Sequence, residues 1–187
     1  MKLSLANKLL IGGAVFCVLG FVAYAFRKNK TSIRNVLLLG GLDTRKNDKH
    51  ISVQSQLLKQ GLGDEYSIKS YRYSDGQGLI NSISKKPKVI VVLFSAGCRQ
   101  AYSVAKAMQE NDQELSNLYI VEPYAVSEKV SKSINSAIDL GVPTKNVIVG
   151  KSKSVGKGVV NNSTSTPECS PNHWCSLTEV GKIIRYK

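Results

Sequence analysis

The chain has 187 residues, 42% of them hydrophobic, and its 26 Lys and Arg outnumber 13 Asp and Glu to give a formal charge of +13. This length suits one domain of ordinary size, and the hydrophobic share excludes a chain that is disordered throughout. Fifteen Gly, five Pro and four Cys exclude collagen-like and disulfide-scaffold proteins, whereas the basic excess invites a nucleic-acid or a membrane interpretation.

The first predicted element is an uncharged apolar segment from Leu9 to Phe26. At about 1.5 Å per residue, a helix of this length spans about 27 Å, enough for the hydrocarbon core of a bilayer. We predict a retained single-pass anchor over residues 1–34, followed by a domain over 35–187. A cleaved signal peptide, with Ala23-Tyr24-Ala25 at its cleavage site, is the alternative.

Basic residues flank this segment on both sides, two before it and four after it: Lys2, Lys8, Arg27, Lys28, Lys30 and Arg34. Their asymmetry favours a cytoplasmic domain. Without these six, twenty basic residues face thirteen acidic ones, a net charge of +7, and part of that lies in the stretch 145–157 with little aromatic interleaving. The charge therefore predicts a lipid membrane as partner, with other proteins of a membrane-associated assembly, and does not favour nucleic acid.

Beyond residue 34, short hydrophobic runs alternate with helical patterns. Strands are predicted at 35–39, 66–73, 88–94, 117–121 and 146–149, and helices at 50–62, 78–84, 99–109 and 127–140. We expect a loop at 151–171 and a final helix or short strand at 177–186. Strands separated by helices predict an α/β fold, a doubly wound and mostly parallel sheet with 88–94 at its centre.

Parallel sheets place their sites at the carboxyl ends of their strands. At the predicted strand ends the chain carries Gly40-Gly41, Ser95 and Glu122, and His173 follows the last strand. The segment VVLFSAGC sets Ser95 between a buried strand and a helix, with small residues after it. It resembles the nucleophile elbow of the α/β-hydrolases, in which a Ser occupies a tight turn from strand to helix.

This resemblance to the lipase and esterase branch covers most of 35–187 by order of elements, although Leu93 replaces the first Gly of G-x-S-x-G. It implies that Ser95 is the nucleophile, His173 the general base, and Glu122, in an acid-Pro step, the residue that orients the imidazole.

The same resemblance implies an oxyanion hole made of backbone N–H groups. They would come from Ala96 and from Gly41 or Leu42.

Cys169, His173 and Cys175 form a C-x3-H-x-C pattern, which hints at a metal site but lacks a fourth ligand. The alternatives are a Cys169–Cys175 disulfide in an oxidising compartment and free thiols in the cytosol. Phosphate-loop and dinucleotide motifs fail on spacing. We therefore expect no metal and no cofactor.

Two functions stay open. The first is a membrane-anchored serine esterase or lipase that acts by acyl transfer. The second is a non-catalytic, membrane-tethered structural or interaction protein, for example a minor component of an envelope or a virion. The large Leu93 at a position that favours Gly, and the small size of the domain, favour the second.

Overall fold

The computed structural model describes residues 34–41, 49–123, 128–149, 164–165 and 174–187. The contacts within the chain divide it after Ile33. The predicted anchor lies outside the described residues, and none of the helices inside them is long and apolar enough to span a bilayer.

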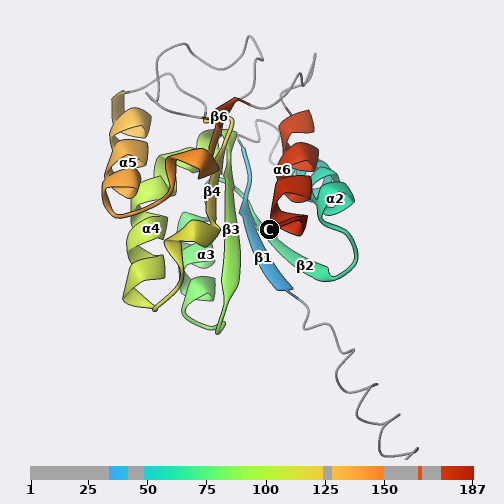
Figure 1. Ribbon diagram of the computed structural model, residues 1–187, viewed down its shortest axis with the longest axis horizontal. Helices are drawn as coiled ribbons and strands as arrows, with labels where there is room; N and C mark the ends of the chain where they lie inside the picture. Colours follow the sequence, from blue (N-terminus) through green and yellow to red (C-terminus); the bar gives the residue numbers. More distant parts are fainter. Residues whose placement is uncertain (1–33, 42–48, 124–127, 150–163, 166–173) are drawn as a thin grey trace, which may run out of the picture. The chain divides into compact units, whose positions relative to one another are not determined.

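A parallel sheet forms the centre of the described domain (Figure 1). Its six strands lie in the order β2-β1-β3-β4-β5-β6, and each of their pairings is parallel. They are β1 Arg34–Leu39, β2 Tyr66–Tyr71, β3 Val89–Phe94, β4 Leu118–Val121, β5 Val147–Val149 and β6 Thr164–Ser165. The order reverses between β1 and β3, as in one of the two common doubly wound arrangements. The predicted α/β class is confirmed.

Helices cover both faces of this sheet (Figure 1). One face carries α3 Gly76–Ile83, α4 Ala101–Glu110 and α5 Glu128–Asp139, and the other carries α2 Lys49–Leu62 and α6 Cys175–Arg185. The described residues also contain three short 3-10 helices. One directly follows β3 and the other two directly precede β4 and β5: η1 Ser95–Gln100, η2 Leu115–Asn117 and η3 Thr144–Asn146. The last predicted segment is therefore a helix.

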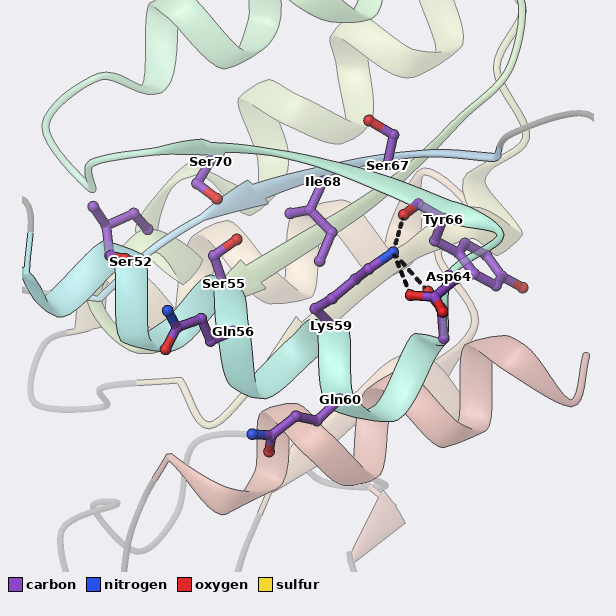
Figure 2. A pocket seen from close by; sticks show the side chains of 12 residues that line it. Ser52, Ser55, Gln56, Lys59, Gln60, Asp64, Tyr66, Ser67, Ile68 and Ser70 are labelled. Carbon is purple, nitrogen blue, oxygen red and sulfur yellow. Dashed lines mark hydrogen bonds and ion pairs between the residues drawn. The ribbon is translucent and has the colours of Figure 1, made fainter.

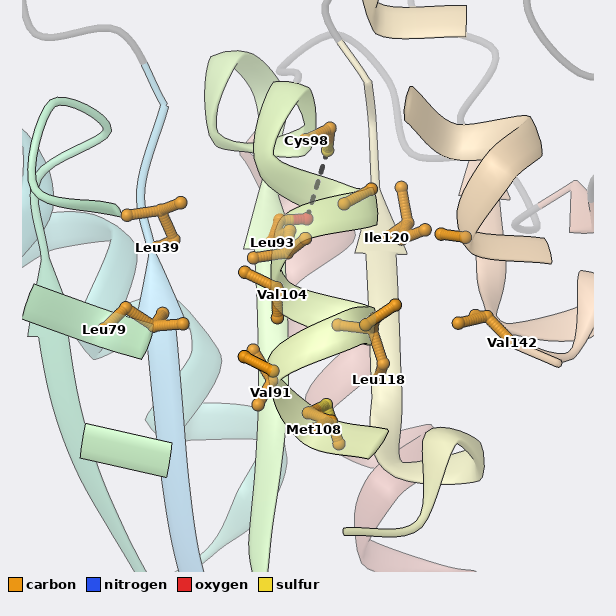
Figure 3. Close-up of a cluster of buried hydrophobic side chains, with 14 of the residues drawn as sticks. Leu39, Leu79, Val91, Leu93, Cys98, Val104, Met108, Leu118, Ile120 and Val142 are labelled. Carbon is orange, nitrogen blue, oxygen red and sulfur yellow. Dashed lines mark hydrogen bonds between the residues drawn. The ribbon is translucent and has the colours of Figure 1, made fainter. Parts of the chain in front are cut away.

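The strands read as continuous apolar runs because alternate residues enter two separate cores. In β3, Val91 and Leu93 pack under α3, α4 and α5 (Figure 3), whereas Val92 and Phe94 pack under α2 and α6. All four are fully buried, which places β3 at the centre of the sheet as predicted.

The strands differ from the prediction by more than one residue in two places, the end of β2 and the additional strand β6. The second strand ends at Tyr71 instead of residue 73, because a turn closes from Asp75 N to Arg72 O (2.8 Å) and the Asp75 carboxylate then caps α3 at Gly78 N (3.0 Å). The two-residue β6 falls in the predicted loop and pairs with β5 at Ile148. So short a strand carries no periodic signal.

The helices α2 and α6 cross at unusually short range, because a Gly stands on each side of the contact. A Cβ added to Gly61 would lie 2.8 Å from Gly181 Cα, and one added to Gly181 would lie 2.8 Å from Gly61 Cα. Thr178 Oγ1 donates to Leu57 O (3.0 Å) beside the crossing.

Candidate functional site

Ser95 stands where β3 ends and η1 begins, next to the point at which the strand order reverses. Its backbone has a φ of 52°, in the left-handed region that side chains with a Cβ rarely adopt. Such a backbone conformation costs about 1–3 kcal/mol and persists only where the surrounding structure imposes it. The side chain is buried to all but 7% of its surface. A positive φ at a Ser between a strand and a helix is one of the features of a nucleophile elbow.

Gly97 makes this tight turn possible. A Cβ at this position would lie 2.7 Å from Leu39 O and 2.8 Å from Gly40 O, so only Gly allows η1 to rest on the end of β1. The nucleophile-elbow pattern has a small residue two positions after the Ser. These close contacts are the steric reason why that residue is Gly97 in this chain. Leu93, at the other end of the pattern, is accommodated fully buried in the core under α4.

Gly41 lies directly against Ser95. A Cβ at Gly41 would approach Ser95 Cβ to 2.9 Å and Ser95 Oγ to 3.2 Å. The structure thus brings together three of the residues singled out in the sequence: Gly41, Ser95 and Ala96, the last of which follows Ser95 directly and is half-buried. Leu42 lies outside the described residues.

Gln54 of α2 belongs to the same cluster and is not among the residues that the sequence singles out. Its Oε1 accepts a hydrogen bond from Gly41 N (3.1 Å), and the residue is only 2% exposed. The signal for it is a polar residue on the apolar stripe of a helix, three positions after Ile51 and four before Leu58. That signal shows burial and does not show what the amide contacts.

Glu122 occupies the corresponding place at the end of β4, the strand next to β3. It also has a positive φ, 47°, it is 1% exposed, and its N–H donates to Ile148 O (2.8 Å). A buried carboxylate at a strained strand end is the kind of group that active sites hold in place.

Cys98 contacts the ends of both strands, β3 and β4, and Figure 3 shows its bond to Leu93. Its thiol lies within hydrogen-bonding distance of Leu93 O (3.3 Å) and Val121 O (3.4 Å), the carbonyls two residues before Ser95 and one before Glu122. Burial raises the pKa of this thiol far above its ordinary value, and the nearby Glu122 charge raises it as well. Cys98 is therefore a neutral structural link and not a nucleophile.

The remaining site residues, His173 and Cys169, lie outside the described residues. Cys175, at the start of α6, is disulfide-bonded, whereas Cys98 is free. The predicted pairing of Cys175 with Cys169 stays a prediction, since the partner is not among the residues that the structure describes. Within those residues no group of three or more metal-ligating side chains comes together.

A groove of about 930 Å³ runs between α2 and the edge strand β2 (Figure 2). It contains Ser, Gln and Ile side chains and Lys59, whose ammonium donates to Gly63 O (2.8 Å) and Tyr66 O (2.6 Å). None of the candidate catalytic residues lines it. Ser95 and Glu122 lie at strand ends, away from the residues that line this groove.

Comparison with known proteins finds no family model, no curated protein and no solved structure that matches this chain.

Proposed function

We propose that this chain is a membrane-anchored serine hydrolase of the esterase or lipase type. The observation that carries the proposal is the positive φ of Ser95, on a turn that Gly97 makes possible and against which Gly41 packs. A helix cap needs no such strain, because Ser caps a helix with an ordinary extended backbone. Strain that the surroundings impose on a single polar residue is typical of catalytic turns.

In the proposed reaction Ser95 Oγ attacks the carbonyl carbon of an ester, and its proton passes to His173. The tetrahedral intermediate collapses as His173 returns that proton to the leaving alcohol, which leaves an acyl group on Ser95. Water, deprotonated by His173, then releases the acid and restores the hydroxyl. Glu122 would orient the imidazole and stabilise its cationic form.

The proposed anchor at residues 9–26 would hold the domain at a bilayer, where lipid and acylated substrates are concentrated. A disulfide at Cys175 favours the oxidising side of that membrane, opposite to the side that the basic flank favours. Because the anchor would hold the domain at the bilayer, we expect ester substrates with apolar acyl chains that meet the domain at the lipid surface.

A fluorophosphonate probe tests the proposal, because it reacts only with an activated serine hydroxyl. We expect the full chain to be labelled, with the adduct on Ser95 by peptide mass spectrometry. Ser95→Ala should lose the label, and Ser103→Ala, on the exposed side of α4, should keep it. Folded wild-type protein that takes no label, or takes it on another residue, would overturn the assignment.

The non-catalytic alternative is favoured by one observation, the fully buried Leu93 where an elbow favours Gly. A tethered scaffold would keep the fold and the anchor and would need no reactive serine. The probe experiment separates the two functions, because a scaffold gives no adduct.

A further inference from the structure

We infer that Gln54 is a positioning residue for the proposed hydrolase: its side-chain oxygen holds the Gly40-Gly41 segment, directly after β1, against Ser95. The inference rests on the proposed function, since this segment matters to catalysis only if Ser95 is the nucleophile. It concerns a residue on another element, 41 positions before Ser95 in the sequence.

Two hydrogen bonds to different elements fix the Gly40-Gly41 segment. Gly40 N donates to Tyr71 O at the end of β2 (2.9 Å), and Gly41 N donates to Gln54 Oε1 on α2 (3.1 Å). A Cβ at Gly40 would lie 2.5 Å from Gln54 Oε1, so the segment has no room to move toward α2. The bond between Gly41 and Gln54 is buried, and Gly40 and Tyr71 are buried residues, so each bond costs more to break than in water.

Ser95 lies against the same segment, next to Gly41. Because a Cβ on Gly41 would come within 3.2 Å of Ser95 Oγ, the backbone of Gly41 forms one wall of the space around the hydroxyl. Loss of the bond to Gln54 would free this wall, and a displacement of about 1 Å in an active site can cost about a hundredfold in rate.

The bond also assigns roles among the candidate oxyanion donors. An N–H that points at Gln54 Oε1 does not point at an oxyanion beside Ser95, so Gly41 supplies the wall and not a donor. Within the proposed mechanism Ala96 stays a candidate donor, whereas Leu42, the alternative to Gly41, lies outside the described residues.

The test compares Gln54→Met with Gln56→Met in the full chain. Methionine has nearly the length of glutamine but accepts no comparable hydrogen bond, and Gln56 is exposed on the same helix. The second-order rate of fluorophosphonate labelling, and kcat and KM for a short-chain p-nitrophenyl ester, are measured beside the thermal midpoint. A third variant, Gln54→Glu, retains an acceptor oxygen.

We expect Gln54→Met to lower the labelling rate and kcat by about tenfold to a hundredfold with little change in KM. Gln54→Glu should recover part of the loss, and Gln56→Met should behave as wild type. If Gln54→Met does not fold, hydrogen exchange of the Gly41 amide in the wild type replaces it, and the amide should be strongly protected.

The possible failures are distinguishable. If wild type is labelled at Ser95 and folded Gln54→Met is labelled at the same rate, the role of Gln54 is overturned and the proposed function stays intact. A Gly41 amide that exchanges freely has the same consequence. Folded wild type without any label overturns the proposed function and this inference with it. If Gln54→Met is less stable but its folded fraction keeps the wild-type kcat, Gln54 contributes to stability alone, and its role as a positioning residue is overturned.

Discussion

Backbone strain at single residues marks the end of β3 and the end of β4 in this domain. Ser95 and Glu122 both have positive φ and both are almost fully buried. Strain of this kind costs about 1–3 kcal/mol per residue, so the rest of the fold must impose it. At Ser95 the contacts of Gly97 with the end of β1 and of Gly41 with the Ser95 side chain impose it.

This strain predicts a stability difference between two variants that lose the same hydroxyl. Ser95→Gly removes the energetic cost of the positive φ, because Gly adopts this conformation readily, whereas Ser95→Ala keeps a Cβ in the left-handed region. We expect the Gly variant to be more stable than the Ala variant by about 1 kcal/mol, although Gly usually lowers stability. Urea denaturation of both measures it, and an Ala variant equal to or more stable than the Gly variant would contradict the strain.

The buried thiol of Cys98 predicts a pH dependence of stability. Its pKa is raised in the folded protein, mainly by burial, so at high pH the unfolded chain loses the thiol proton while the folded chain keeps it. The unfolded state then binds fewer protons, and stability falls as the pH rises above about 8.5, by at most about 1.4 kcal/mol per pH unit from this group.

Cys98→Ser provides the comparison, because serine can donate to the same carbonyls but does not titrate in this range. We expect the free energies of unfolding of wild type and variant to differ by a constant amount between pH 7 and 8, and the wild type then to lose stability relative to the variant as the pH rises from 8.5 to 10. Parallel curves over this whole range would show that the thiol titrates equally in both states.

At the scale of elements, the crossing of α2 and α6 decides how the second face of the sheet is covered. Gly61→Ala would drive a methyl group into the backbone of α6, because its Cβ would lie 2.8 Å from Gly181 Cα. We expect a loss of about 1–3 kcal/mol, even though Ala is the better helix former by about 1 kcal/mol. Gln60→Ala, exposed on the same helix, should change stability by less than about 0.5 kcal/mol. Equal denaturation midpoints for the two variants would contradict a close crossing.

Most elements of the domain could be predicted from the sequence because each carries its own local signal. Buried parallel strands give unbroken apolar runs such as Val89–Phe94, and amphipathic helices such as Glu128–Asp139 give a periodic stripe. The strand β6 could not be predicted, because two residues, paired with Ile148 and Val149, leave no pattern.

At the scale of the whole molecule, the proposed anchor predicts where the protein is found. We expect the full chain to stay in the membrane fraction after alkaline carbonate extraction. Val18→Arg, in the middle of the apolar segment, should release much of it, since Arg at that depth costs about 2.5–3.5 kcal/mol. Val53→Arg, at an exposed position of α2, is the matched control and should stay with wild type. Extraction of the wild type into the soluble fraction would exclude a retained anchor.

The sequence by itself determined the α/β class, the position of most helices and strands, and the choice of Ser95 and Glu122 as candidates, because these follow from local patterns and from the rule that sites lie at strand ends. Only the tertiary structure decided the strand order, the positive φ of Ser95 and the contact of Gly41 with its hydroxyl. It alone also paired Gln54 with Gly41 and Gly61 with Gly181. Each of these features depends on contacts between residues that lie far apart in the chain. A local pattern of apolar and polar residues does not specify which distant partner a residue contacts.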